Sequence, residues 1–247
     1  MFEDVTLREE GQVSIVEINR PTKLNAIRIQ TYRDIIAALK AADGSADTSV
    51  IIITGAGGKF TAGNDLADLI GEQSKQVMGC VQDIFDTLNQ LEKPLIAAVE
   101  GVAVGIGTTL LLHCDLAVAG AGTKFRLPFA NLGVCPEGAS SALLPPAIGS
   151  KQANELLLTG RFFSADEAAV WGLINRVVDK GQALAGAMEY AQAMLQQPKL
   201  SLMATKDIIR QHRGVDVGAI VKNELNTFVA LLEDDETQMR ISAMLDR

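Results

Sequence analysis

The chain has 247 residues, and 22 Lys and Arg against 30 Asp and Glu give a net charge of −8 and a pI near 4.9. This acidic balance disfavours nucleic acid as a partner, because binding it requires basic residues that neutralise phosphates. The 48% apolar and 21% charged residues are typical of a globular protein with a large core.

Four apolar runs rich in β-branched residues predict buried strands. They cover residues 13–18, 50–54, 95–99 and 115–119. Apolar residues that recur every three or four positions predict helices centred near Ile35 and Ile84, and a glycine-rich turn after Gly101 leads into an apolar helix ending near His113. Because strand, glycine turn and helix follow one another several times, the sequence predicts an α/β core.

From about residue 150 the pattern becomes helical. A helix over 151–158 is expected to end at Gly160, and Ser164 with Glu167 has the spacing of a capping box that opens a short helix closed by Gly172. Further helices are predicted over 181–197, 199–213 and 216–245. We therefore expect an α/β core over 1–195 and a C-terminal helical region over 196–247 that is not an independent domain.

The cysteines favour a reducing compartment. Cys80, Cys114 and Cys135 are odd in number and lack CxxC spacing, which disfavours a disulfide framework and a zinc site. The first ten residues lack the basic start and apolar stretch of a signal peptide, and the longest apolar region, 102–112, is too short to span a membrane. We expect a cytoplasmic protein with no metal and no membrane partner.

The glycines do not form a nucleotide-binding fingerprint, because Leu110 and Phe60 stand where the third glycine would be needed. Both glycine-rich segments, 55–66 and 93–107, instead follow predicted strands and could leave backbone N–H groups unpaired. Two such groups that converge would form an oxyanion hole. The alternative is that these glycines only form turns.

Four segments in a consistent order, 20–26, 60–66, 93–115 and 160–177, resemble the enoyl-CoA hydratase/isomerase (crotonase) family. The resemblance runs from about residue 10 to residue 210. It implies a crotonase-like spiral of ββα units and acyl-CoA thioester substrates, with coenzyme A as part of the substrate and no other cofactor. It also implies a homotrimer or a dimer of trimers, held partly by apolar faces of the helices after residue 180. Those faces include Ile220, Leu225, Phe228 and Leu232.

The resemblance also implies the binding residues. By motif position, the N–H groups of Ala62 and Ile106 form the oxyanion hole. The residues implied to bind substrate or CoA are Lys23, Leu24, Ala26, Ala62, Gly63, Asn64, Asp65 and Leu66. Two of these have alternatives: Lys23 as a solvated surface lysine, and Asp65 as the cap of the helix that follows it.

Hydratases of the family resemble one another in using two glutamates. Those positions hold Thr109 and Phe129 here. Because neither side chain is a general acid or base at neutral pH, a two-carboxylate hydratase is disfavoured. Both residues are expected to line the acyl pocket instead.

Residues 131–141 resemble the segment of Δ3,Δ2-enoyl-CoA isomerases that carries a single catalytic glutamate, which is Glu137 here. The alternative is an acidic residue in the first turn of a helix. We therefore expect an isomerase that moves a 3-enoyl-CoA double bond to the 2-position, with Glu137 shuttling the proton. The other possibilities are a hydratase, another crotonase-type lyase or hydrolase, and a non-catalytic acyl-CoA-binding subunit.

Overall fold

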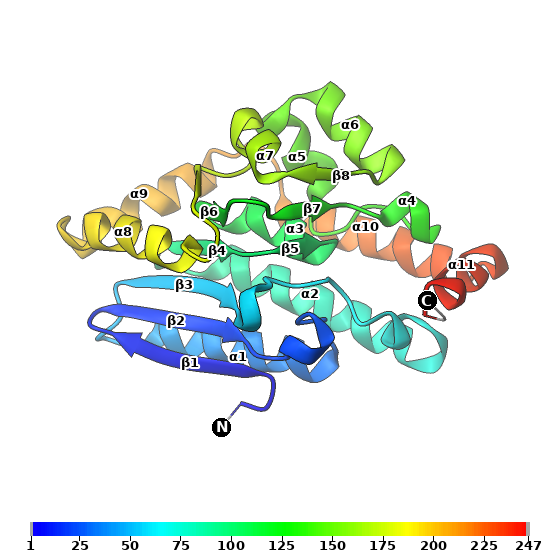
Figure 1. Ribbon diagram of the computed structural model, residues 1–247, viewed down its shortest axis with the longest axis horizontal. Coiled ribbons are helices and arrows are strands. Elements are labelled where there is room, and N and C mark those ends of the chain that lie inside the picture. Colours follow the sequence, from blue (N-terminus) through cyan, green and yellow to red (C-terminus); the bar gives the residue numbers. More distant parts are fainter. Residues whose placement is uncertain (1, 246–247) are drawn as a thin grey trace.

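The computed structural model describes residues 2–245, whose strands form a six-stranded and a three-stranded sheet (Figure 1). The larger sheet has the order β1-β2-β3-β4-β6-β9, antiparallel between β1 and β2 and parallel elsewhere. The smaller has the order β5-β7-β8, parallel and then antiparallel. The strands are β1 (Val5–Glu10), β2 (Val13–Ile18), β3 (Val50–Gly55), β4 (Leu95–Val99), β5 (Val102–Val104), β6 (Leu116–Gly120), β7 (Lys124–Arg126), β8 (Phe162–Ser164) and β9 (Arg176–Val178).

Helices join and cover these strands. The α-helices are α1 (Ile29–Gly44), α2 (Ser74–Gln90), α3 (Ile106–Thr109), α4 (Phe129–Leu132), α5 (Ser140–Ile148), α6 (Ser150–Thr159), α7 (Ala165–Trp171), α8 (Ala183–Leu195), α9 (Lys199–Gln211), α10 (Val217–Leu232) and α11 (Asp235–Leu245). Short 3-10 helices are η1 (Pro21–Lys23), η2 (Ala56–Gly58), η3 (Leu66–Leu69), η4 (Gly71–Gln73) and η5 (Leu110–His113). No helix within residues 2–245 has both the length and the apolar character needed to cross a membrane.

Two strands followed by a helix recur along the chain, as β1-β2-α1, β4-β5-α3 and β6-β7-α4. A further unit lies between β1-β2-α1 and β4-β5-α3. In it, β3 is followed by an isolated β-bridge between Thr61 and Ala103 where a second strand would stand, and then by α2. The first strand of each unit joins the larger sheet, and from the third unit on the second strand joins the smaller one. The predicted spiral of ββα units is therefore confirmed.

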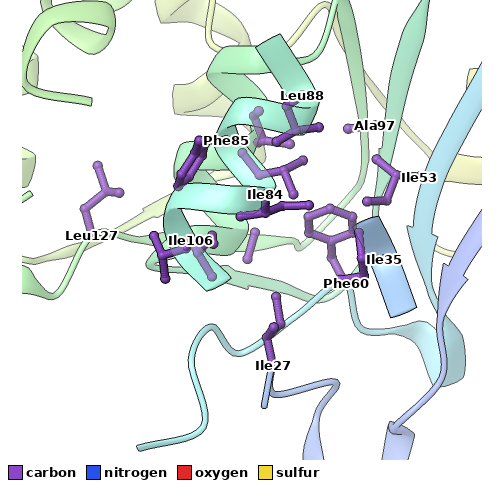
Figure 2. Packing of buried hydrophobic residues seen from close by; sticks show 14 of the residues in the cluster. Ile27, Ile35, Ile53, Phe60, Ile84, Phe85, Leu88, Ala97, Ile106 and Leu127 are labelled. Atoms are coloured by element: carbon purple, nitrogen blue, oxygen red, sulfur yellow. The ribbon is translucent and has the colours of Figure 1, made fainter. Parts of the chain in front are cut away.

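The parallel strands of the larger sheet are buried on both faces, as their apolar runs predicted. Side chains alternate along β3, so that Ile51 and Ile53 belong to one hydrophobic cluster and Val50 and Ile52 to another. Figure 2 shows part of the first cluster, in which Ile53 meets side chains from α1 and α2. The second cluster is closed by the small residues of α8, Ala183, Ala187 and Ala191.

The predicted helix boundaries at the glycines are confirmed. Gly160 and Gly172 end α6 and α7 in the left-handed conformation. The Ser164 hydroxyl accepts a hydrogen bond from the Glu167 N–H, and the Glu167 carboxylate accepts one from the Ser164 N–H. This reciprocal pair is the predicted capping box.

The helical tail differs from the prediction in two respects. The segment predicted as one helix over 216–245 is two, α10 and α11, separated at residues 233–234. The apolar face predicted to meet another subunit faces this chain instead, since Leu225, Phe228 and Leu232 are buried in the larger cluster, where α10 packs on α2. The C-terminal helices thus share a hydrophobic core with the α/β region. The large apolar side chains that stay exposed in this region include those of α9.

Candidate active site

The segment 61–65 lies between the turn after β2 and strand β5. The turn after β2 pairs with it through three backbone hydrogen bonds. The Ala62 N–H donates to the Leu24 carbonyl at 3.0 Å. The Ile27 N–H donates to the Gly63 carbonyl at 2.8 Å, and the Asp65 N–H donates back to the Ile27 carbonyl at 2.9 Å. The two segments that the resemblance implied for CoA binding therefore run side by side.

On its other side the same segment pairs with β5. The Thr61 N–H donates to the Val102 carbonyl, and the Val104 N–H donates to the Thr61 carbonyl, both at 3.1 Å. Glycines make this approach possible: a Cβ at Gly63, whose φ is +90°, would lie 2.6 Å from the Val104 oxygen, and a Cβ at Gly107 would lie 2.5 Å from the Thr61 methyl carbon. The start of α3 is thereby held against residues 61–64.

The prediction for Ala62 as an oxyanion donor is wrong, because its N–H is already bonded to Leu24. Asn64 is the better candidate. Its neighbours make both bonds to Ile27, so its own N–H points to the opposite side. Within residues 2–245 the N–H groups of Asn64 and Ile106 have no acceptor. These are the unpaired donors that the glycine-rich turns suggested, shifted by two residues in the first turn.

Ile106 keeps its donor although it has a β-branched side chain. It is the first residue of α3, so its N–H has no partner within the helix. The unusual backbone conformation falls on Gly105, at φ 54° and ψ −118°, and the Gly105 N–H is satisfied by the Arg126 carbonyl at 2.9 Å. Ile106 therefore needs no glycine-like conformation to expose its N–H.

Asn64 and Ile106 line the same cavity, whose volume is about 190 Å³. Apart from Arg126, the lining is uncharged and mostly apolar. It comprises Ala62, Gly63, Asn64, Leu66, Leu69, Val104, Gly105, Ile106, Arg126, Pro128, Phe129, Leu132, Phe228 and Met244. Of the predicted binding residues, Lys23, Leu24, Ala26 and Asp65 do not line this cavity. The predicted acyl-pocket residue Phe129 does, and α10 and α11 close the cavity through Phe228 and Met244.

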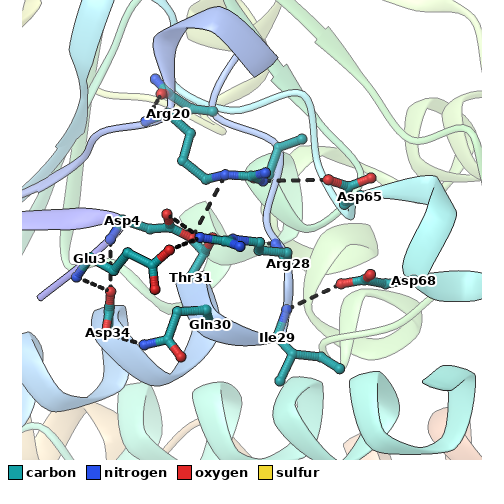
Figure 3. Close-up of polar contacts among 12 residues, drawn as sticks. Glu3, Asp4, Arg20, Arg28, Ile29, Gln30, Thr31, Asp34, Asp65 and Asp68 are labelled. Atoms are coloured by element: carbon teal, nitrogen blue, oxygen red, sulfur yellow. Dashed lines mark hydrogen bonds and ion pairs between the residues drawn. The ribbon is translucent and has the colours of Figure 1, made fainter.

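The turn beside the cavity carries charge that is already paired. The Asp65 carboxylate lies 3.4 Å from an Arg20 guanidinium nitrogen, as Figure 3 shows, and Arg20 also lies 3.7 Å from Asp4. Asp65 makes no capping bond to η3, so its capping alternative is wrong. Lys23 is exposed on the same turn. Its exposure is compatible with both interpretations of this residue, as a CoA-binding lysine and as a solvated surface lysine.

Glu137 is 1% exposed and lies in the loop before α5, which begins three residues later. The alternative of a first-turn acidic residue is therefore wrong. Its Oε1 accepts a hydrogen bond of 2.6 Å from the Thr109 hydroxyl, and its buried Oε2 has no partner within the described chain. Burial raises the pKa of Glu137 to about 8; the Thr109 bond lowers it and the charge of Glu224 raises it.

The prediction that Thr109 lines the acyl pocket is wrong. Thr109 follows Ile106 by one turn of α3, and its hydroxyl points at Glu137 instead of into the cavity. That hydroxyl also lies 3.4 Å from the Ile106 carbonyl. Thr109 thus joins the carboxylate to the helical turn whose first N–H is free, although Glu137 does not itself line the cavity.

A comparison with known families decides the family of this chain. The family model described as Enoyl-CoA hydratase/isomerase matches residues 8–247. The chain belongs to the enoyl-CoA hydratase/isomerase family. The family acts on acyl-CoA thioesters, as the resemblance implied. The cavity with the two N–H groups that have no acceptor among residues 2–245 lies where residues 62–66 and 104–106 meet.

Relatives within the enoyl-CoA hydratase/isomerase family carry both activities in their names. The chain is 30% identical to crotonyl-CoA hydratase of Syntrophomonas wolfei, over all of this chain and 96% of the relative. It is 32% identical to enoyl-CoA delta isomerase 2 of Rattus norvegicus, over 98% of this chain and 63% of the relative. The solved structure of Pseudomonas aeruginosa OdaA has 34% identity and a TM-score of 0.94, covering 99% of this chain and all of that chain.

The sequence predictions missed Glu224 altogether and missed the oxyanion-donor role of Asn64. Glu224 on α10 contacts the loop that carries Glu137, although the loop residues it bonds, Ala139 and Ser141, lie 85 and 83 residues away in the sequence. The Asn64 N–H was predicted only as part of a CoA-binding segment. The hydrogen bonds between residues 24–27 and 62–65 decide which N–H of this turn lacks an acceptor, and no local sequence pattern predicts those bonds. Among residues 2–245, no group of three or more His, Cys, Asp or Glu is placed to hold a metal ion.

Proposed function

We propose that this chain is an enoyl-CoA isomerase that converts a 3-enoyl-CoA to a 2-enoyl-CoA. The observation that carries the proposal is Glu137, a buried carboxylate whose Oε2 has no partner among residues 2–245. Its Oε1 is bonded to Thr109 of α3, the helix whose first N–H also has no acceptor among those residues. A carboxylate buried without a full set of partners is costly, and such groups concentrate at catalytic sites.

The proposed reaction begins with the thioester oxygen between the N–H groups of Asn64 and Ile106. The Glu137 carboxylate takes a proton from carbon 2, and the negative charge that develops on the oxygen is stabilised by the two N–H donors. The resulting dienolate receives the same proton from Glu137 at carbon 4, which leaves the double bond at the 2-position. A pKa of about 8 leaves about a tenth of Glu137 ionised at pH 7 and suits a group that must both take and return a proton.

Hydration is the other activity named among the relatives, and it needs a second group to activate water. Thr109 and Phe129 supply no carboxylate at the positions where hydratases carry theirs. The remaining buried glutamate nearby, Glu224, accepts three hydrogen bonds from its own loop partners. These features favour a mechanism with one carboxylate.

The test is a pair of assays with purified protein, one with a 3-enoyl-CoA and one with the matching 2-enoyl-CoA. The ultraviolet absorbance of the conjugated 2-enoyl thioester is followed, and products are identified by liquid chromatography. We expect the first substrate to gain conjugation and the second to remain unhydrated. Rapid loss of conjugation from the 2-enoyl substrate, with formation of a 3-hydroxyacyl product, would instead assign a hydratase.

We further propose a homotrimer or a dimer of trimers, with α9 contributing to the contact. Leu200, Ile208 and Ile209 are large apolar side chains that α9 exposes in the single chain, and contiguous exposed apolar side chains are typical of subunit interfaces. Light scattering at micromolar concentration should give three or six times the chain mass. Ile209→Asp should lower that mass, and a monomeric wild type would contradict the proposal.

A further inference from the structure

We propose that Glu224, on α10, is a positioning residue that holds the Glu137 loop in its working conformation and presents a negative charge to the catalytic carboxylate. The inference rests on the proposed function, in which Glu137 is the base. It gives the C-terminal helical region a part in the chemistry, because α10 belongs to that region, whereas Asn64, Ile106 and Glu137 lie within residues 1–195.

The contacts of Glu224 fix the loop on the C-terminal side of Glu137. One carboxylate oxygen accepts the Ala139 N–H at 2.6 Å, and the other accepts the Ser141 N–H at 3.0 Å together with the Ser141 hydroxyl. Ala139 has a φ of +56°, a left-handed conformation that a non-glycine residue adopts only when its surroundings enforce it. Glu224 supplies part of that enforcement two residues from Glu137.

The loop is held from the core as well, so its position is defined on both sides. The buried His113 ring donates through Nε2 to the Gly138 carbonyl at 2.7 Å. The Ser140 hydroxyl donates to the Glu137 carbonyl at 2.6 Å. A rigid loop is what a base needs when it must reach two carbon atoms of one bound enolate.

Of the titratable groups around Glu137, Glu224 is the one whose neighbours favour its charged form, because three N–H and O–H groups donate to its carboxylate. Burial lowers the pKa of His113 to about 4, so its imidazole is neutral. Burial raises the pKa of Tyr32 on α1 well above 10 and that of Cys135, in the same loop, to about 11, so both are neutral too. Burial also raises the pKa of Glu224, but its three donors lower it and favour the carboxylate. Its negative charge raises the pKa of Glu137.

The decisive variant is Glu224→Gln, which keeps the shape and one acceptor oxygen but removes the charge. We expect kcat to fall about tenfold and KM to change less than about threefold, because the cavity wall is intact. Removing a neighbouring negative charge favours ionised Glu137. The acid limb of the kcat profile should therefore move to lower pH, by about one unit.

Ser141→Ala is the matched control, since it removes one hydrogen bond to Glu224 and keeps the charge. It should lower kcat without moving the acid limb to lower pH. The same drop in kcat for both variants, with neither limb displaced, would show that Glu224 only stabilises the loop, and would overturn the proposal.

A carbon-13 NMR titration of the Glu137 carboxyl, assigned by its disappearance in Glu137→Gln, separates this inference from the proposed function. The Glu137 titration should move to lower pH in Glu224→Gln whether or not the enzyme turns over. An unmoved titration overturns the role of Glu224 even if Glu137 proves to be the base. If Glu224→Gln does not fold, Glu224→Asp is titrated instead: it draws the charge back by one methylene, and an unmoved titration there also overturns the proposal.

Discussion

The Thr109 hydroxyl donates a 2.6 Å hydrogen bond to one oxygen of Glu137, while the other oxygen of that carboxylate is buried without a partner in the described chain. A hydrogen bond to the ionised form favours ionisation, whereas burial opposes it. Burial and the charge of Glu224 raise the pKa of Glu137, and the Thr109 bond lowers it. The Thr109 bond and the Glu224 charge can each be removed by a point substitution.

Thr109→Val should move the acid limb of the kcat profile to higher pH. The substitution keeps the branched shape and removes the donor that stabilises the Glu137 carboxylate. Since the Thr109 bond lowers the pKa of Glu137, its loss should raise that pKa, by about one unit if the bond is of ordinary charged strength. The direction is opposite to that expected for Glu224→Gln.

The control for this variant is Thr108→Val. The Thr108 hydroxyl donates to the Ala103 carbonyl at 2.6 Å and not to Glu137, so its loss should lower stability by about 1 kcal/mol without displacing the limb. The profiles of wild type and both variants are compared under the same conditions. Equal limbs in all three would mean that the Thr109 bond does not act on the titrating group.

Glu137→Gln should stabilise the folded protein, and more so at high pH. In the folded state the carboxyl stays protonated up to a pKa of about 8, whereas in the unfolded state it ionises near 4.5. Between these values the unfolded state binds fewer protons, so the wild type loses stability as pH rises, and Gln, which does not titrate, avoids this loss. The stability difference, measured by urea unfolding, should grow by at least about 1 kcal/mol from about pH 5 to about pH 9. A constant difference would show that Glu137 ionises freely in the folded protein.

Ile106→Pro should remove one oxyanion donor with little damage to the fold, because the first position of a helix tolerates proline. We expect kcat to fall about 10²–10³-fold, the range for one lost donor, with a small change in CoA affinity. Ile106→Ala, which keeps the N–H, should retain most of the rate. Similar rates for the two variants would remove Ile106 from the hole.

Most of the sheet was predictable because its parallel strands are buried on both faces and leave continuous apolar runs, as in β3 and β4. The edge strand β1 was missed, because it holds Arg8, Glu9 and Glu10 and only its first residue, Val5, is fully buried. The strands β5, β7, β8 and β9, each three residues long, are too short for any periodicity to show.

Residue type and local motif predicted three features that the structure shows: the place of Phe129 in the cavity wall, the N–H of Ile106 without an acceptor among the described residues, and a glutamate, Glu137, buried close to α3. The site was not predictable where a contact between distant segments decides the role. Ala62 cannot serve as an oxyanion donor because its N–H is hydrogen-bonded to the Leu24 carbonyl. Thr109 faces Glu137 instead of the cavity, and Glu224 reaches the loop that carries Glu137 only because α10 packs against it.

Isomerisation of a 3-enoyl-CoA by the Glu137→Gln variant is the sharpest test of Glu137 as the sole base. Gln keeps the size of the side chain and removes its proton affinity, so kcat should fall at least about 10²–10⁴-fold, the usual contribution of a general acid–base group. CoA affinity should change little, because the residues predicted to bind CoA, within 23–26 and 62–66, are unchanged. A rate within about threefold of wild type would contradict the account, since it lies far below the loss expected for a general base.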